Sequence, residues 1–415
     1  MVQGGTRLAG SIGINGAKNA VLPIIAASLL TSEDVQLINV PILEDVRTMS
    51  DLVESVGTKV RLGQGSLYIK ANQLWRTEIP APLATRIRYS ILLAGALLSR
   101  SGEVKLPLPG GCVIGTRKID LHLRALSLLG AKTRIVKGCL VAKAKKMKGA
   151  KIPLRIPSVG ATENIMIAAC LAHGTTTISN AAKEPEIVDL AKFINSMGGH
   201  IVGAGTDTIT IRGVDRLSGA CHSIIPDRIE AGTFMIATAI THGDVLVKGA
   251  RPDHLHSVIE KLREMGVAIV TTKEGLRVTG TEEFRPVRMI TEVYPGFPTD
   301  MQPIVAPLLS LARGQSTVRE TIFDSRFAYV AGLQAMGADI HVVGNTAMIT
   351  GVQQLKGVRV VATDIRGGAA LIIAGLAANG QTVISNIYEI DRGYEEIEAK
   401  LASIGARVER TKLKI

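Results

Sequence analysis

The chain has 415 residues, a length at which a single hydrophobic core normally gives way to two domains. Aromatic residues make up only 3%, which argues against nucleic-acid recognition by base stacking. The net charge of +12 serves either solubility or an anionic ligand, and the positions of the arginines decide between the two. No apolar run approaches the roughly 18 residues of a membrane-spanning helix, and the first residues lack the pattern of a signal peptide. We therefore expect a cytoplasmic protein without membrane insertion.

A short pattern recurs six times along the chain, in which the tail of a helix is followed by a glycine and a strand. The marker glycines are Gly57, Gly130, Gly198, Gly266, Gly337 and Gly405. They are separated by 73, 68, 68, 71 and 68 residues. A period this regular indicates a repeat architecture, with three of the six units in each of two domains.

Each unit opens with a helix that is apolar nearly all round, and such a helix must be buried. The six helices are expected at residues 20–30, 87–98, 165–172, 233–240, 304–312 and 369–378. A strand, an amphipathic helix and two further strands follow each of them. The sequence thus predicts an α/β fold in which three units could surround their own buried helices, an α/β barrel turned inside out.

Charged or polar residues stand where the buried helices begin. They are Lys18-Asn19, Arg86 and Arg88, Thr162-Glu163, Arg228 and Glu230, Thr299-Asp300, and Asp364 and Arg366. Acids and threonines cap helix starts routinely, but cations there oppose the helix dipole. Lys18, Arg88 and Arg366 therefore lead us to expect an external anion, bound where these helix starts converge.

The connection in the second unit is longer than its counterparts. From Leu106 to Gly130 it spans 24 residues, whereas the equivalent span from Asn180 to Gly198 has 18. The extra residues lie in 109–117, which contains three glycines, so we expect a mobile lid. Cys112 stands in this segment near Arg117 and Lys118, which favour a reactive thiolate.

An ordered set of segments resembles the enolpyruvyl transferase family, and within it the UDP-N-acetylglucosamine 1-carboxyvinyltransferases. The segments are residues 15–20, 108–117, 158–162, 297–302, 364–366 and 390–394. The resemblance implies a two-domain inside-out α/β barrel. It places residues 18–225, with the Cys112 lid loop, in the first domain and residues 226–415 plus 1–17 in the second.

The resemblance also implies a reaction. Phosphoenolpyruvate would donate its carboxyvinyl group to the 3′-hydroxyl of UDP-N-acetylglucosamine and release phosphate, at the first committed step of peptidoglycan precursor synthesis. It thereby implies a part in cell wall biogenesis, cell shape and cell division. It implies no metal, no organic cofactor and no nucleic-acid partner.

Site residues follow from the same resemblance. Cys112 would be the proton donor to the vinyl carbon, and Asp300 would meet the 3′-hydroxyl. Phosphoenolpyruvate would contact Lys18, Asn19, Arg117 and Arg392. The nucleotide sugar would contact Arg88, Arg117, Lys118, Ile119, Asp120, Leu121, Ser158, Val159, Asp300 and Ile322. Arg326, Asp364 and Arg366 would form a supporting polar network.

Two positions depart from the family pattern. Some members carry a lysine two residues before the serine at 158, where this chain has Ile156 preceded by Arg155. The position of Leu92 is often aromatic in relatives. Arg155 is the candidate substitute for the missing lysine, and Leu92 should affect packing more than chemistry.

The chemistry itself needs one acid and one base, because adding an alcohol across an enol ether puts a proton on carbon and removes one from oxygen. Cys112 and Asp300 fit these roles, with Asp300 as base or orienting acceptor. Arginines provide bidentate contacts to phosphate and carboxylate. The candidate cations come from separate units, so we expect a site between the domains and closure when the nucleotide sugar binds.

Two other functions were weighed. A transferase acting on shikimate 3-phosphate shares the fold but lacks a cysteine-bearing lid. A repeat scaffold or RNA-binding protein would explain the basic charge, but the cations cluster at helix starts. Cys139, Cys170 and Cys221, and the pair His254 and His256, lack the spacing of a metal site.

Overall fold

The computed structural model describes residues 1–110, 114–115 and 118–411. It divides into two compact units. The first domain contains residues 16–110 and 118–225, and the second contains residues 1–15 and 226–411 together with 114–115. Each domain encloses its own hydrophobic core.

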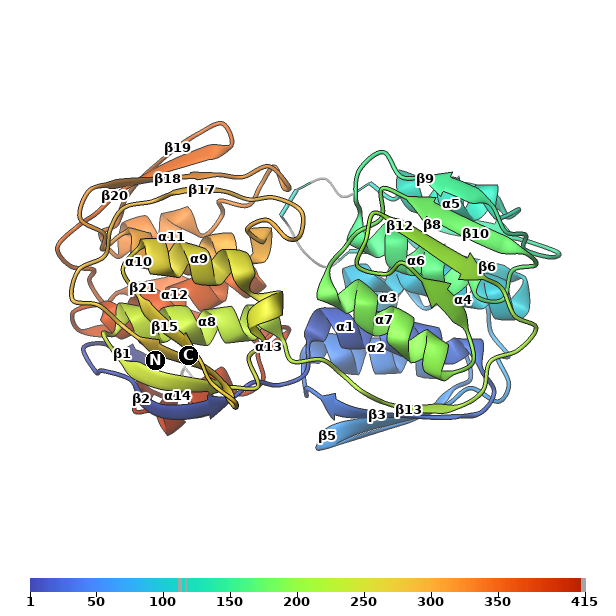
Figure 1. Ribbon diagram of the computed structural model, residues 1–415, viewed down its shortest axis with the longest axis horizontal. Coiled ribbons are helices and arrows are strands. Elements are labelled where there is room, and N and C mark those ends of the chain that lie inside the picture. The colour runs from blue at the N-terminus through green and yellow to red at the C-terminus, as the bar shows by residue number, and fades with distance from the viewer. Residues whose placement is uncertain (111–113, 116–117, 412–415) are drawn as a thin grey trace. The chain divides into compact units, whose positions relative to one another are not determined.

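Three helices lie at the centre of each domain and pack against one another (Figure 1). In the first domain they are α1 (Lys18–Ala27), α4 (Leu92–Ser101) and α6 (Val159–Ala169). In the second they are α8 (Arg228–Ile240), α10 (Gln302–Leu309) and α12 (Ile365–Ala377). Short 3-10 turns η1 (Ser28–Leu30), η2 (Arg88–Ile91) and η4 (Thr299–Met301) adjoin α1, α4 and α10. All six expected apolar helices are confirmed.

Close approach between the inner helices is possible because small residues stand at their crossings. A Cβ added to Gly95 on α4 would lie 2.4 Å from the side-chain oxygen of Asn164 on α6. In place of that Cβ, the Gly95 N–H donates a 3.0 Å hydrogen bond to the same oxygen. Glycine is therefore required by the packing of these two helices.

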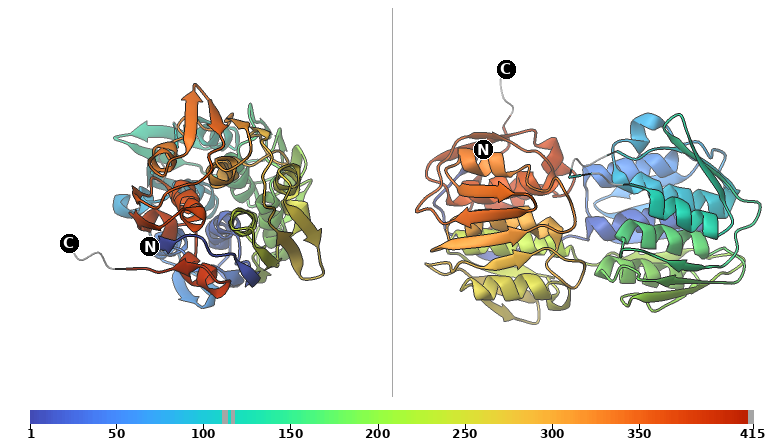
Figure 2. Two further views of the ribbon diagram at one scale, coloured as in Figure 1. Left: turned by 90° about the vertical axis from the view of Figure 1, so that its left-hand side faces the viewer. Right: turned by 90° about the horizontal axis from the view of Figure 1, so that it is seen from above.

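The strands form three sheets in each domain. In the first domain, one sheet contains, in spatial order, β13 (Ala220–Ser223), β3 (Asp34–Val40), β5 (Gly65–Lys70) and β4 (Lys59–Gly63). A second sheet contains β6 (Glu103–Pro107), β8 (Cys139–Lys143) and β7 (Lys132–Val136). The third contains β11 (His200–Val202), β12 (Thr208–Arg212), β10 (Thr175–Ser179) and β9 (Lys151–Pro153). In the second domain, one sheet contains, in spatial order, β15 (Ala268–Thr271), β16 (Gly275–Thr279), β14 (Asp244–Lys248) and β2 (Ala9–Gly13). A second sheet contains β17 (Arg288–Ile290), β18 (Gln315–Arg319), β20 (Thr346–Thr350) and β19 (Asp339–Val343). The third contains β21 (Arg359–Val361), β22 (Gln381–Ser385), β1 (Val2–Gln3) and β23 (Arg407–Val408). Figure 2 shows the inner helices of the second domain with strands outside them.

Amphipathic helices complete the repeating units. They are α2 (Glu44–Glu54), α5 (Asp120–Leu128), α7 (Pro185–Ser196), α9 (His256–Glu264), α11 (Val330–Ala335) and α14 (Ile397–Ser403). The remaining short helices are α3 (Ala81–Ala84), η3 (Pro252–His254) and α13 (Tyr388–Asp391). The fold is the inside-out α/β barrel that the sequence predicts. No helix in the described part of the chain has the length and apolar character needed to cross a membrane.

The predicted repeat was incomplete, because it omitted the short strand that precedes most of the inner helices. β2, β9, β13, β17 and β21 each run parallel to the first strand of another unit. They have only three to five residues, which is too short for a periodic pattern to be recognised. Each of these short strands lies at one edge of its sheet.

The first residues of the chain belong to the second domain. β1 lies between β22 and β23, and β2 pairs with β14. Leu8, which lies between β1 and β2 along the chain, is fully buried in the second domain's core. The N-terminal segment is therefore part of that core.

Replacing Leu8 by alanine should lower the free energy of unfolding by about 2–5 kcal/mol, because the lost methyl groups leave a cavity. Arg7→Ala at the exposed neighbour should cost less than about 1 kcal/mol, since Arg7 only forms a surface ion pair with Glu282. Chemical unfolding followed by circular dichroism measures both. Equal small losses would contradict a core role for the N-terminal segment.

Candidate active site

The Asp300 carboxylate at the start of α10 is contacted by two arginines of the second domain. Arg326 Nη2 donates to Oδ1 at 2.7 Å, and Arg366 donates through Nε and Nη2 to Oδ2 at 3.2 and 3.1 Å. Both arginines are buried, whereas the Asp300 side chain keeps 27% of its surface exposed. An ionised carboxylate accepts hydrogen bonds and donates none, and here both oxygens accept from guanidinium groups. The geometry presents Asp300 as a fixed acceptor that solvent reaches.

Arg366 is held in place at the beginning of α12. Asp364 caps this helix, and its Oδ1 accepts hydrogen bonds from the backbone N–H groups of Arg366 and Gly367. The guanidinium also lies 5.3 Å from the centroid of the Tyr394 ring, and the Tyr394 hydroxyl is 2.9 Å from Thr233 Oγ1 on α8. The predicted supporting residues Arg326, Asp364 and Arg366 thus lie in one network with Asp300.

Arg392 follows directly after α13 and is 4% exposed. Its Nη1 donates to Glu389 Oε2 at 2.8 Å. The next residue, Gly393, lies against Ile365 and the Arg366 guanidinium at the start of α12. The structure therefore brings Arg392 close to the Asp300 network within the second domain.

In the first domain, Lys18 is the first residue of α1 and is buried. Its Nζ lies 2.8 Å from Oδ2 of Asp45, which stands in the first turn of α2. Lys18 therefore has a carboxylate partner within the protein, which the sequence analysis did not anticipate. Arg366 likewise has Asp300 as its partner.

The residues assigned to the nucleotide sugar in the first domain are joined by two contacts. Arg88, at the start of η2, donates to the carbonyl of Lys118 at 3.2 Å. Asp120, the first residue of α5, pairs with Arg155 at 2.5 Å. Ile119 and Leu121 adjoin these positions along the chain. Arg155, the candidate substitute for the family's lysine, is thus held beside the segment 118–121.

Ser158 and Val159 form the start of α6. The Ser158 hydroxyl accepts from the N–H of Ala161 at 3.4 Å, so it caps the helix. Further along, the Asn164 side chain is hydrogen bonded to the Nδ1 of His122 on α5 at 3.0 Å. This buried pair fixes α5 against α6, and with it the two segments that the resemblance assigns to the nucleotide sugar.

Glu163, on the same helix, is fully buried. Neither of its carboxyl oxygens has a hydrogen-bond partner among the described residues. Burial, followed by the charges of Glu186 and Glu184, raises the pKa of Glu163 well above its usual value. The folded protein therefore favours the neutral form of this side chain.

Two predicted site residues, Cys112 and Arg117, lie outside the described residues. Between them, the carbonyl of Ile114 accepts a 3.2 Å hydrogen bond from the Ser325 N–H. Ser325 immediately precedes Arg326 along the chain. The described part of the lengthened connection is thus attached next to the arginine that holds Asp300.

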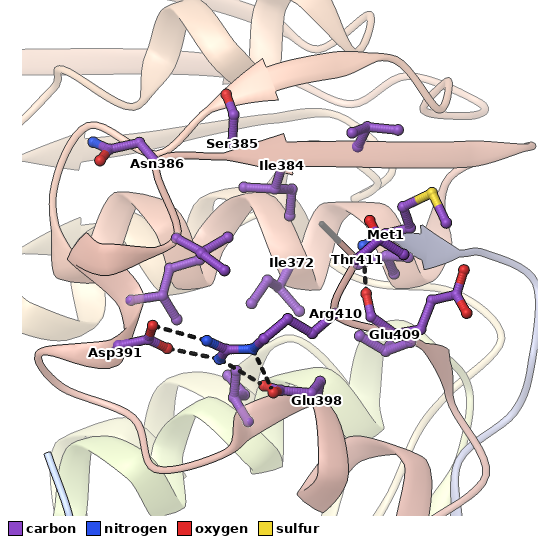
Figure 3. Close-up of a pocket in the computed structure, with 16 residues that line it drawn as sticks. Met1, Ile372, Ile384, Ser385, Asn386, Asp391, Glu398, Glu409, Arg410 and Thr411 are labelled. Carbon is purple, nitrogen blue, oxygen red and sulfur yellow. Dashed lines mark hydrogen bonds and ion pairs between the residues drawn. The ribbon is translucent and has the colours of Figure 1, made fainter. Parts of the chain in front are cut away.

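A separate cavity of about 170 Å³ lies in the second domain beside α13. Figure 3 shows Ile372 and Ile384 at this cavity and the Arg410 guanidinium between Asp391 and Glu398. Arg410 donates to both carboxylates at 2.7–3.2 Å, so its charge is already balanced by the protein. We assign no substrate to this cavity.

The described residues contain no cluster of three or more histidine, cysteine or acidic side chains arranged for a metal ion. Sequence reasoning also overlooked Asp45, His122 and Glu320 as parts of the site's surroundings. Asp45 resembles an ordinary first-turn acid, and His122 and Glu320 carry no motif. Only the polar Asn164 within an otherwise apolar helix could have signalled the contact with His122.

Comparisons with known proteins agree on one family. A family model for EPSP synthase (3-phosphoshikimate 1-carboxyvinyltransferase) matches residues 2–401. The chain is 52% identical to UDP-N-acetylglucosamine 1-carboxyvinyltransferase 1 of Caldanaerobacter subterraneus subsp. tengcongensis, with 97% of each chain covered. It is 51% identical to the protein of the same name from Carboxydothermus hydrogenoformans, covering 99% of this chain and 97% of the relative.

Solved structures agree on the fold. The enolpyruvyl transferase NikO from Streptomyces tendae matches with a TM-score of 0.87 and 25% identity, covering 98% of this chain and 97% of that one. An EPSP synthase from Acinetobacter baumannii matches with a TM-score of 0.77 and 18% identity, covering 99% of both chains. At 18% identity, the second match supports the fold alone.

The raised pKa of Glu163 makes a prediction about stability. The pKa of Glu163 is higher in the folded protein than in the unfolded chain. As the pH rises above the pKa of the unfolded chain, this carboxyl ionises more readily in the unfolded chain, and the free energy of unfolding falls. Glu163→Gln cannot ionise and should therefore stabilise the protein more at pH 8 than at pH 5. Unfolding free energies at the two pH values, with the exposed Glu54→Gln as control, measure this difference. A Glu163→Gln effect that does not change with pH would contradict the assignment.

Proposed function

The chain belongs to the EPSP synthase family of enolpyruvyl transferases, and from that premise we propose that it transfers the carboxyvinyl group of phosphoenolpyruvate to the 3′-hydroxyl of UDP-N-acetylglucosamine. Phosphate is the second product. The proposal that UDP-N-acetylglucosamine is the acceptor rests on the 52% identity, over 97% of both chains, to a relative whose name specifies that acceptor.

The reaction has two steps, the addition of the sugar hydroxyl to phosphoenolpyruvate and the elimination of phosphate. The 3′-oxygen bonds to C2 of phosphoenolpyruvate while C3 receives a proton, giving a tetrahedral adduct. The group that protonated C3 then takes a proton back from C3, the bond between C2 and the phosphate oxygen breaks, and the enol ether and free phosphate result. One group must therefore deliver a proton to carbon and another must accept the hydroxyl proton or its hydrogen bond.

We assign the first role to Cys112 and the second to Asp300. The contacts of Asp300 with Arg326 and Arg366 support its role as an acceptor of fixed direction. As the 3′-oxygen bonds to C2, we assign its proton to the Asp300 carboxylate, which also orients the 3′-hydroxyl.

The anionic parts of the substrates need cations, which also polarise the donor. We assign phosphoenolpyruvate to Lys18, Asn19, Arg117 and Arg392. We assign the nucleotide sugar to Arg88, the segment 117–121, Ser158, Val159, Asp300 and Ile322. Because these residues come from both domains, the proposal includes closure of the domains on the nucleotide sugar.

This activity would place the protein at the first committed step of peptidoglycan precursor synthesis, in the cytoplasm where both substrates would be available. The residues themselves supply acid, acceptor and cations, so the proposed mechanism uses neither a metal nor an organic cofactor.

Phosphate release tests the reaction and the role of Cys112 together. The wild-type protein should release phosphate from phosphoenolpyruvate only when UDP-N-acetylglucosamine is present, and shikimate 3-phosphate should not replace it. Cys112→Ala should lower kcat by about 100-fold or more, because general-acid catalysis contributes roughly 10²–10⁴-fold. The exposed Cys221 offers a matched control, and Cys221→Ala should keep normal turnover. Normal turnover of Cys112→Ala would refute the assigned role.

The Asp300→Asn variant tests the acceptor. An amide has roughly the same shape but no negative charge and only one acceptor oxygen, so both arginines would lose their carboxylate partner and one of them would face an NH₂ group. We expect kcat to fall at least about 100-fold. Asp339→Asn at an exposed site in the same domain should have no effect on kcat. If Asp300→Asn turned over at the wild-type rate, Asp300 could not be the acceptor.

A further inference from the structure

Glu320 is a buried carboxylate that accepts four hydrogen bonds and has no assigned role in the reaction. It follows β18 and is 2% exposed. Its Oε1 accepts from Thr291 Oγ1 at 2.9 Å and from the N–H groups of Ile322 and Phe323 at 2.7 and 3.2 Å. Its Oε2 accepts from Thr299 Oγ1 at 3.0 Å.

This set of donors explains why a carboxylate stands at 320. Two backbone N–H groups and two hydroxyls point at one side chain, and an ionised carboxylate can accept from all of them at once. An alanine would remove the acceptor of the half-buried Ile322 and Phe323 N–H groups. A glutamine would keep one oxygen for three of the donors and present an NH₂ group to Thr299.

One end of this arrangement fixes the turn at 320–323. Because Oε1 accepts both consecutive N–H groups, Ile322 cannot move without breaking a hydrogen bond to the buried Glu320 carboxylate. Thr321 is anchored as well, since its N–H donates to Thr291 Oγ1 at 2.9 Å. Ile322 is the residue of this turn that we assign to the nucleotide sugar.

The other end fixes the residue before Asp300. The Thr299 hydroxyl donates to Glu320, while its carbonyl accepts from Arg326 Nε at 3.1 Å. The same Arg326 reaches Asp300 through Nη2. Residue 299 is thus held from two sides, and the direction of the Asp300 carboxylate depends on both contacts.

We propose that Glu320 is a positioning residue of the transfer reaction, which sets the Ile322 turn through one carboxylate oxygen and the Asp300 carboxylate through the other, by way of Thr299. Glu320 itself touches no reacting atom. The inference rests on the proposed function, because it concerns the same acceptor site. It predicts that the contact of Glu320 with Thr299 and its contacts with the Ile322 turn affect different kinetic constants.

Thr299→Val removes only the link to Asp300. We expect kcat to fall about 10- to 100-fold, since small misplacements of reacting groups cost on this order, with the KM for UDP-N-acetylglucosamine within about 3-fold of wild type. Thr299→Ser keeps the hydroxyl and should restore kcat. Thr238→Val is the matched control, because it removes a buried hydroxyl from α8 whose hydrogen bond, within the described part of the chain, goes to the Phe234 carbonyl of the same helix. It should leave both constants unchanged.

Glu320→Ala removes both the contact with Thr299 and the contacts with the Ile322 turn. It should therefore raise the KM for UDP-N-acetylglucosamine about 10-fold as well as lower kcat. Hydrogen exchange at the Ile322 and Phe323 amides should be faster in this variant but not in Thr299→Val. Glu320→Gln keeps one oxygen for these amides and should retain the wild-type KM. If Glu320→Ala does not fold, Glu320→Gln and the Thr299 pair still decide the question.

Two results would overturn the inference: a kcat for Thr299→Val within about 2-fold of Thr238→Val, or a Glu320→Ala variant whose KM and amide exchange match wild type. Failure of the wild-type protein to transfer the carboxyvinyl group is a separate outcome. It would reject the proposed function, and the inference with it, whereas active wild type with unaffected variants would reject the inference alone.

Discussion

The structure depends on six helices that have no polar face. Such helices are stable in water only when other elements surround them on every side, so each domain places three of them at its centre and its strands outside. Residues along α12, for example, are buried for nearly its whole length. Polar groups can then reach a ligand only at the helix ends. Charged side chains of the inner helices accordingly stand at or next to the starts of α1, α10 and α12, as Lys18, Asp300 and Arg366 do.

Charges at these helix starts are paired inside the protein and are therefore held in fixed directions. Lys18 pairs with Asp45, and Arg366 and Arg326 pair with Asp300. Buried ion pairs add little net stability, but breaking one leaves a costly unpaired charge. Their value here is geometric, because a fixed array of donors and acceptors does not have to reorganise when the reaction develops charge.

The sequence was sufficient for the repeat, the apolar helices and the positions of the charged helix starts, because each rests on a local pattern of residues. It was insufficient for the pairing of those charges. The Lys18–Asp45 contact joins two different helices, and nothing local distinguishes Asp45 from an ordinary capping acid. Glu320 shows the same limit, since its four donors come from three separate segments of the chain. The short strands before the inner helices were missed because three to five residues carry too little pattern.

Placement of Asp300 beside the acceptor hydroxyl is the central claim, and a crystal structure with bound UDP-N-acetylglucosamine tests it most directly. The distance between the 3′-oxygen of the sugar and the nearer Asp300 carboxylate oxygen is the quantity to measure. The account predicts a hydrogen bond of about 2.5–3.0 Å, with Arg326 and Arg366 still on the carboxylate. A sugar bound with its 3′-hydroxyl directed away from Asp300, or bound at another part of the protein, would contradict it.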